Sequence, residues 1–284
     1  MQTDFKIGEA KISVISGAAF PFDKDVSLFA DETCSGEDAE ITYELKFVKE
    51  FAPVWGNILH RNYGMIIMDV DGTENRIHLL PANGQPFAIT VCEDEYRRTV
   101  YIDEKAVPVL KWDRNLLGLM MLERDVLMSD SFLLHASYII YEGQAIVFTA
   151  PSGTGKSTQA DLWAKHAGAK VINGDRTLLI KKDGRWYAGG FPVCGSSPYC
   201  LNETAPLKAV ICLEKAPVNN AVKMGAIESI KAVYSQSFVN NWSSRDCDKT
   251  ASLIADLADN VEIYKYSCTK EEDAVSFLKG VLGL

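Results

Sequence analysis

Lys156 and Ser157 are the residues whose types and positions point most directly to chemistry. They lie in residues 150–158, which read APSGTGKST and follow an apolar run at 145–149. The two glycines of this stretch allow a turn whose backbone N–H groups point inward at an anion. In loops of this type the lysine reaches the β and γ phosphates and the hydroxyl ligates Mg2+. The spacing therefore predicts a loop that binds ATP with Mg2+.

The neighbouring segments are those that such a loop requires. Residues 145–149 (AIVFT) read as a buried strand, and 159–166 (QADLWAKH) read as a helix whose first turn adds unpaired N–H groups and a positive dipole end. Ala150 replaces the first glycine of the strict pattern G-x-x-x-x-G-K-[ST], which an alanine can do if its φ is negative. The alternative is a glycine- and serine-rich turn with a solvated lysine, and the agreement of strand, loop and helix argues against it. The residues expected at the nucleotide are Ser152, Gly153, Thr154, Gly155, Lys156, Ser157 and Thr158.

Phosphoryl transfer also needs a carboxylate for the metal and a group that handles the acceptor hydroxyl. Asp175 follows the next predicted strand, where it can reach Mg2+ or its waters, and we favour this role over an ordinary turn aspartate beside Gly174. His135 lies in an apolar strand that precedes the loop strand. From its spacing alone, a core histidine is the simpler interpretation.

Two further groups are candidates for contacts with the substrate. Arg176 can bind phosphate or pair with an acid within the fold. Gly195, Ser196 and Ser197 can offer N–H and hydroxyl groups to an anion, or can form a flexible loop. The sequence alone does not decide between these alternatives.

The composition excludes several classes of partner. The chain has 284 residues, of which 47% are hydrophobic, and a net charge of −9. This charge argues against a nucleic-acid partner, because no basic stripe is present to release counterions. No apolar run approaches the length of a membrane span, and the first residues do not resemble a signal peptide, so we expect a cytoplasmic protein with no membrane partner. A homo-oligomer remains open.

The chain divides into two parts by the type of its elements. Residues 1–111 read mostly as strands, with a tight hairpin turn at Asp71-Gly72, and we expect a β-rich domain of unknown role. Residues 112–130 have apolar positions near helical spacing and read as one helix. We place the domain boundary there, so that residues 112–284 form the second domain. The predicted fold class is α/β.

Several segments in combination resemble a known family. Residues 134–137 (LHAS), 151–158 (PSGTGKST), 173–176 (NGDR) and 191–197 (FPVCGSS) are similar to the motifs of the HPr kinase/phosphorylase-type proteins. This family shares its phosphate loop with ATP-dependent phosphoenolpyruvate carboxykinases. The resemblance covers about residues 130–284 and does not extend to the first domain. It implies an HPr kinase/PEP carboxykinase-like P-loop (Walker A) domain.

The resemblance also implies roles for individual residues. His135 occupies the position of the family's histidine before the loop, which places it with Lys156 and Asp175 among the catalytic residues. Asp175 holds the second place of the family's acidic pair, and with Ser157 it would bind the metal. The first place, that of the proton-handling aspartate, is Gly174 here. The base is then His135, Asp175 or an acid from elsewhere, or base catalysis matters little beside positioning and charge neutralisation.

These observations lead to one function and two alternatives. We expect a kinase that transfers the γ-phosphoryl group of ATP to a hydroxyl, most simply a Ser or Thr of a peptide or protein. Because Gly174 replaces an acid, one alternative is a nucleotide-dependent binding module with little transferase activity. The other alternative is a kinase that acts on a small metabolite resembling serine.

Overall fold

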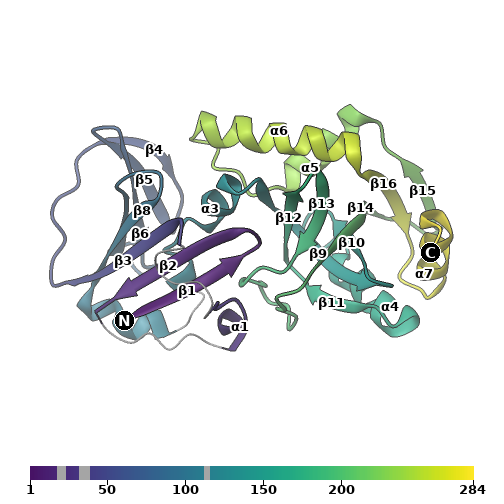
Figure 1. Cartoon of the computed structure of the whole chain (residues 1–284), viewed down its shortest axis with the longest axis horizontal. Coiled ribbons are helices and arrows are strands. Elements are labelled where there is room, and N and C mark those ends of the chain that lie inside the picture. Colours follow the sequence, from purple (N-terminus) through teal and green to yellow (C-terminus); the bar gives the residue numbers. More distant parts are fainter. Residues whose placement is uncertain (18–23, 32–38, 112–115) are drawn as a thin grey trace. The chain divides into compact units, whose positions relative to one another are not determined.

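The computed structural model describes residues 1–17, 24–31, 39–111 and 116–284, and in it the chain forms two compact units, Met1–Asp125 and Val126–Leu284. Each unit contains its own eight-stranded sheet (Figure 1). The fold class is therefore mixed α/β, with β structure dominant in the first unit. The boundary between the units falls within α3 (Leu122–Met128), further along the chain than residue 111.

The sheet of the first unit has the strand order β1-β2-β3-β8-β7-β6-β5-β4. Neighbouring strands are antiparallel except for β2–β3 and β3–β8. The expected turn joins β5 to β6, and Asp71 and Gly72 both have positive φ, which a two-residue hairpin turn requires. The strands are β1 (Gln2–Ile7), β2 (Ala10–Ser16), β3 (Ile41–Val48), β4 (Asn57–Arg61), β5 (Met65–Val70), β6 (Thr73–Leu79), β7 (Pro86–Cys92) and β8 (Arg97–Asp103).

The prediction of a single helix over residues 112–130 is wrong. Residues 112–115 lie outside the described part. Residues 116–117 are helical, the chain turns at 118–120, and the helix α3 covers only Leu122–Met128. Side chains of the sheet take the backbone groups that a continuous helix would use: Thr90 Oγ1 donates to Leu119 O at 2.7 Å, and Met121 N donates to Tyr43 Oη at 2.8 Å. The other helical elements of this unit are α1 (Lys24–Ser27) and the 3-10 helix η1 (Glu104–Lys111).

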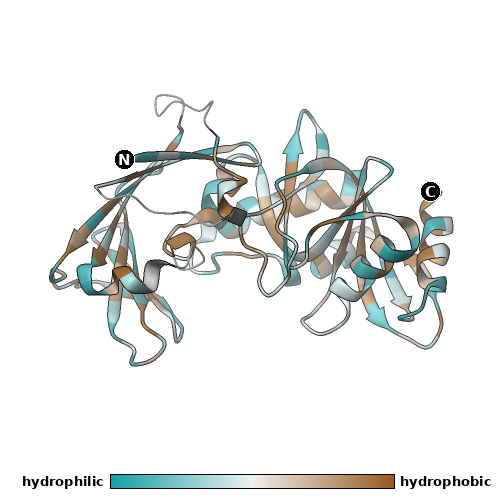
Figure 2. Cartoon of the chain, turned by 90° about the horizontal axis from the view of Figure 1, so that it is seen from below, coloured by the Kyte–Doolittle hydropathy of each residue, from teal (hydrophilic) through white to brown (hydrophobic). Residues whose placement is uncertain are grey.

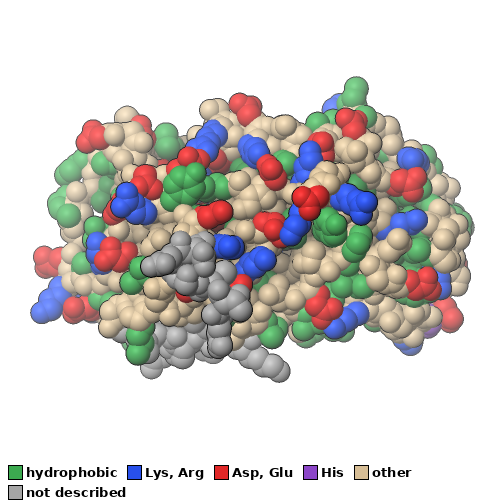
Figure 3. Space-filling view, viewed as in Figure 1, with side chains coloured by type: hydrophobic (Ala, Val, Ile, Leu, Met, Phe, Trp, Pro, Cys, Tyr) green, Lys and Arg blue, Asp and Glu red, His purple; other side chains and the backbone are tan. Residues whose placement is uncertain are grey.

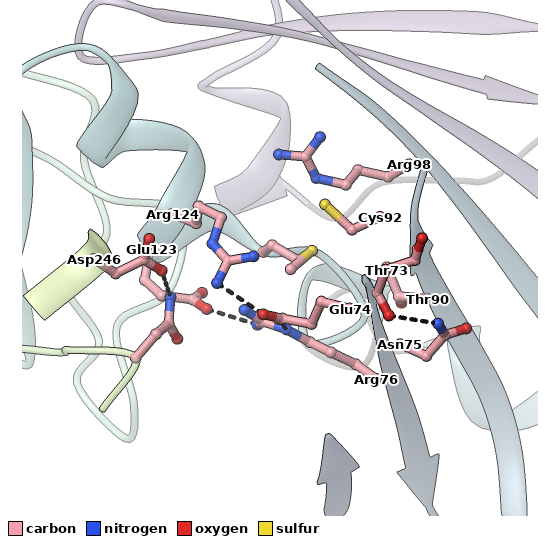
Figure 4. A network of polar contacts seen from close by, with 12 residues as sticks. Thr73, Glu74, Asn75, Arg76, Thr90, Cys92, Arg98, Glu123, Arg124 and Asp246 are labelled. Atoms are coloured by element: carbon pink, nitrogen blue, oxygen red, sulfur yellow. Dashed lines mark hydrogen bonds and ion pairs between the residues drawn. The ribbon is translucent and has the colours of Figure 1, made fainter. Parts of the chain in front are cut away.

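Ion pairs hold the start of α3 against β6 (Figure 4). The buried Arg76 guanidinium lies between Glu74, at 2.8 Å, and Glu123, at 2.6 Å. Arg124 also pairs with Glu74, at 2.8 Å. Because these groups are largely shielded from water, each charge needs its partner, and the network fixes where α3 leaves the sheet.

The second unit contains a sheet that partly closes on itself. Its order is β10-β9-β12-β13-β14-β16-β15, with β11 on β9, and β10 also pairs with β14. The long strands β9 and β14 each pair with different neighbours along their length, and this joins β10, β9, β12, β13 and β14 into a ring. The strands are β9 (Ser131–Tyr141), β10 (Gln144–Thr149), β11 (Lys170–Asn173), β12 (Arg176–Lys182), β13 (Arg185–Gly189), β14 (Thr204–Lys215), β15 (Asn220–Lys223) and β16 (Glu262–Cys268).

Helices cover both faces of this sheet (Figure 1). On one face α5 (Ala226–Gln236) and α6 (Ser244–Asn260) contribute Val233, Leu253, Ile254 and Leu257 to a core that also takes Ala145 and Val147 of β10. On the other face α4 (Lys156–Ala167) and α7 (Asp273–Leu282) bury Trp163 and Leu278 against Ile146 and Phe148. The strand before the predicted loop is thus buried on both sides, as its unbroken apolar sequence indicates.

Side chains of different types are interspersed along the C-terminal helix and over one face of the molecule. Figure 2 shows teal and brown residues mixed along the helix next to the C-terminus, α7, as in an amphipathic helix. On the face seen in Figure 3, basic and acidic side chains are interspersed. Among the described residues, no helix has the length and apolar character needed to cross a membrane.

Candidate functional site

The predicted strand, turn and helix around Lys156 are all present. β10 ends at Thr149, and α4 begins at Lys156. Within the turn the left-handed backbone falls on Gly153, with φ of 76°, and on Gly155, with φ of 124°, whereas Ala150 is not among the described residues with positive φ. This explains why alanine is accepted at the position of the first glycine.

The Lys156 side chain folds back and hydrogen-bonds the start of the loop. Its Nζ donates to Ala150 O at 2.9 Å, and the residue is 7% exposed. Burial lowers the pKa of Lys156, and the Asp175 carboxylate opposes this shift, which places the two groups within electrostatic reach of each other. The first N–H groups of α4 have no carbonyl partner in their own helix, so the loop presents donors and an ammonium at one place.

Asn173 shapes the turn that carries Asp175, and the sequence analysis gave it no role. Its side chain is fully buried, and its Oδ1 accepts the backbone N–H groups of Asp175 and Arg176, both at 2.9 Å. Its Nδ2 donates to Phe191 O at 3.0 Å and to Val193 O at 3.3 Å. An asparagine before a turn is a known signal for such bonds, but its partners in the second loop cannot be inferred from local sequence.

Asp175 lies between two of the predicted site residues. Its Oδ1 is 3.7 Å from His135 Nε2, and its Oδ2 is 3.5 Å from Arg176 Nε. His135 and Arg176 are direct partners in the β9–β12 ladder, which sets their two side chains beside each other. The β9–β12 register therefore places His135 at the start of β12, next to the turn that carries Asp175.

His135 is only partly buried, so it is not the core residue that its spacing alone suggests. Its side chain is 26% exposed. Burial lowers the pKa of His135, and the nearby Lys156 ammonium lowers it further, against the opposing effect of Asp175. The imidazole is therefore held in its neutral form near pH 7, in which one ring nitrogen can accept a proton.

Ser157 and Asp175 form the only pair of predicted metal ligands, and they lie close together. Ser157 Oγ donates to Gly174 O at 3.4 Å, next to Asp175. Among the described residues no group of three or more His, Cys, Asp or Glu side chains could hold a metal ion. This donor set fits Mg2+, which keeps several waters and binds through one or two protein oxygens together with substrate phosphates.

The loop that contains Gly195 and Ser197 packs directly on the Asp175 turn. A Cβ on Gly174 would lie 2.2 Å from Ser197 Oγ, and a Cβ on Gly195 would lie 2.7 Å from Asp175 Cγ. An acid at position 174 therefore cannot be accommodated while Ser197 keeps its place. Ser196 is exposed at the same turn.

A cavity of about 360 Å³ opens beside His135 and Asp175. Its other wall consists of the end of α5 and the residues that follow it, and these were not predicted as part of the site. Phe238 N donates to Leu133 O at 3.0 Å, which fixes this segment to β9. The α5 wall lies about 60 residues beyond Asp175 and Arg176 in the chain and about 100 beyond His135, and no local signal in the sequence connects the two walls. The lining residues are His135, Asp175, Arg176, Ser235, Gln236, Ser237 and Phe238.

Comparison with known proteins assigns the chain to a family. Residues 104–265 match the family model described as ScmC, SynChlorMet cassette protein ScmC, and this span is more than half of the chain. The chain belongs to the ScmC family. The ScmC match includes the loop, Asp175 and the cavity. No curated protein matches the chain. A solved structure of the Hpr(Ser) kinase/phosphatase from Coxiella burnetii is similar to 53% of this ScmC-family chain and to 93% of its own length, with 9% sequence identity and a TM-score of 0.33.

Proposed function

We propose that the unit Val126–Leu284 binds ATP with Mg2+ and transfers the γ-phosphoryl group to a hydroxyl. The observation that carries this proposal is the convergence of Lys156, Ser157 and Asp175 at the start of α4, with His135 facing the same carboxylate at 3.7 Å. A phosphate loop with a metal ligand and a neutral imidazole provides the parts that phosphoryl transfer uses.

Each residue has a separate task in this proposal. Lys156 and the loop N–H groups hold the β and γ phosphates, while Ser157 and Asp175 hold Mg2+, which neutralises phosphate charge when bound. His135 accepts the proton of the acceptor hydroxyl as the new oxygen–phosphorus bond forms and the bond between the γ phosphorus and ADP breaks. The acceptor expected from the sequence is a Ser or Thr of a peptide or protein, or a small hydroxyl compound.

Binding is tested first, by calorimetry with Mg2+ and a nonhydrolysable ATP analogue. Replacing Lys156 by Ala should weaken binding by about 10- to 100-fold, because a charge-assisted hydrogen bond contributes about 1.5–3 kcal/mol. Lys165→Ala is the matched control, since Lys165 is exposed in the last turn of the same helix, at the opposite end from the loop. Equal affinities of the two variants would contradict the proposal.

Transfer is tested separately, with γ-labelled ATP and a cell extract as the source of acceptors. Label in a peptide, protein or small molecule that is lost in His135→Gln and Asp175→Asn supports the kinase. Tight nucleotide binding with no transfer, unaffected by Asp175→Asn, would instead identify a nucleotide-dependent binding module.

A further inference from the structure

The cavity beside His135 has an uneven distribution of hydrogen-bond donors. Ser235 Oγ donates to Ala232 O at 2.8 Å, and Ser237 Oγ donates to Val233 O at 2.8 Å. Both hydroxyl protons are therefore directed at carbonyls of α5, and the oxygens present lone pairs. The Gln236 amide nitrogen is directed at Ser235 O, at 3.2 Å, and the Gln236 side chain also hydrogen-bonds the His135 ring. The α5 wall thus offers few donors to a ligand.

Arg176 supplies the positive charge of this cavity. Of the described residues that line it, Arg176 alone has a permanently cationic group. The Arg176 side chain is 33% exposed, so it is accessible to a small ligand. A guanidinium presents several N–H groups in one plane and matches a carboxylate with two parallel hydrogen bonds.

The position of this guanidinium is fixed by its neighbours. Its Cζ lies 4.7 Å from the centroid of the Phe238 ring, so the aromatic face orients the cation. Its Nε is shielded from solvent and has no hydrogen-bond acceptor among the described residues, because Asp175 Oδ2, at 3.5 Å, is an ion-pair partner without hydrogen-bond geometry. A shielded N–H donor beside an open cavity is available to a water or to an acceptor on a ligand.

We propose that this cavity is the acceptor subsite and that the acceptor carries a carboxylate close to its hydroxyl. The inference rests on the proposed function, which places the reacting hydroxyl at His135. Arg176 binds the carboxylate, and the hydroxyl then faces His135, which lies beside Arg176 in the β9–β12 ladder. A hydroxy acid can be a free small molecule or the end of a peptide chain, and both present the same pair of groups.

The reaction at this subsite is balanced without another reactant. The acceptor oxygen forms a bond to the γ phosphorus, the bond from that phosphorus to the β-phosphate oxygen breaks, and ADP leaves. The hydroxyl proton passes to a ring nitrogen of His135. The carboxylate of the acceptor is unchanged, since it serves only to position the hydroxyl.

The test compares acids with their amides. Calorimetry is carried out on the full chain with glycolate, L-lactate, D-glycerate, L-serine and a peptide that ends in serine, each as the free acid and as the amide. We expect at least one acid to bind about tenfold more tightly than its amide, because the amide loses the charged partner of Arg176. Preference for the free compounds or for the peptide distinguishes the two sources of acceptor.

Variants assign the preference to Arg176. Arg176→Gln should remove it, Arg176→Lys should keep part of it, and Arg185→Gln, at an exposed arginine of the same unit, should leave it intact. Equal binding of acid and amide, binding of no acid, or a preference that survives in Arg176→Gln would overturn the inference. Titrations with and without the Mg2+ nucleotide separate its failure from failure of nucleotide binding itself.

Discussion

Gly174 shows how a single residue can decide the chemistry of this site. The resemblance places an acid at position 174, and its absence raises the question of which group replaces it. The structure adds a steric reason, since the space for a side chain there is filled by Ser197 from a loop more than twenty residues further along. The strand, turn and helix around Lys156 could be predicted from sequence because they depend on local spacing. The contact of Gly174 with Ser197 could not, because it depends on how two loops fold together.

This contact predicts the behaviour of a pair of variants. Gly174→Ala places a Cβ 2.2 Å from Ser197 Oγ and 2.6 Å from Ser197 Cβ, so the loop must move away from Asp175. We expect a loss of about 1–3 kcal/mol in unfolding free energy from this overpacking, together with weaker Mg2+-nucleotide binding. Ser197→Gly in the same chain should restore most of both quantities, because it removes the clashing atoms.

Chemical denaturation and calorimetry on the two single variants and the double variant give the coupling energy. Ser196→Gly is the matched control, since Ser196 is exposed in the same loop. Additive effects of Gly174→Ala and Ser197→Gly would contradict the proposed contact.

At the scale of elements, strand pairing explains both the success and the failure of the sequence analysis. The strands around the loop were predicted correctly because their apolar runs are continuous and bounded by turns. The pairing of β9 with β12, which brings His135 to Arg176, is a tertiary property that no local pattern specifies. In the same way, the apolar periodicity of residues 112–130 predicts a helix, but bonds from Tyr43 and Thr90 hold the backbone at Met121 and Leu119 in another conformation.

One of these bonds determines which ring nitrogen of the buried His78 carries a proton. Thr90 Oγ1 donates its proton to Leu119 O, so it must accept a proton from His78 Nε2, which lies 3.0 Å away. His78 therefore carries a proton on Nε2. Burial lowers the pKa of His78 to about 3, and the nearby Arg76 lowers it as well. An unfolded chain binds a proton at this residue below about pH 6.5.

The first unit should therefore lose stability in acid. The contribution of His78 is fully present above about pH 6.5 and falls as the pH decreases toward 3, by about 1.4 kcal/mol per pH unit. Urea unfolding between about pH 7 and about pH 5 measures this slope. His78→Gln keeps an N–H donor for Thr90 but cannot titrate, and it should flatten the slope. His60→Gln, at a partly exposed histidine on β4, should retain it. An unchanged slope in His78→Gln would show that other groups control the acid sensitivity.

At the scale of the whole molecule, each of the two sheets lies within one unit. β1–β8 form the first sheet, and β9–β16 form the second. The unit Val126–Leu284 contains all the residues of the candidate site. The division into a β-rich first part and an α/β second part could be predicted from the change in patterning along the chain. The structure divides the two units within α3, after Asp125, rather than near residue 111.

The division into two units predicts which parts of the chain a bound nucleotide protects from hydrogen exchange. A ligand that binds only the folded second unit stabilises it by mass action, by about 2.7 kcal/mol at a hundredfold excess over its Kd. Hydrogen exchange followed by mass spectrometry on the full chain should therefore slow in peptides from β9, β10, α4 and the 173–176 turn when Mg2+ and the ATP analogue are added. Peptides from β1–β8 should exchange at unchanged rates, and Lys156→Ala should abolish the protection. If protection also appeared across β1–β8 in the wild-type chain and vanished in Lys156→Ala, nucleotide binding would be coupled to the first unit, and the two units could not be treated as independent in stability. Because each peptide belongs to one unit alone, the same measurement tests the nucleotide site and whether the two units are independent in stability.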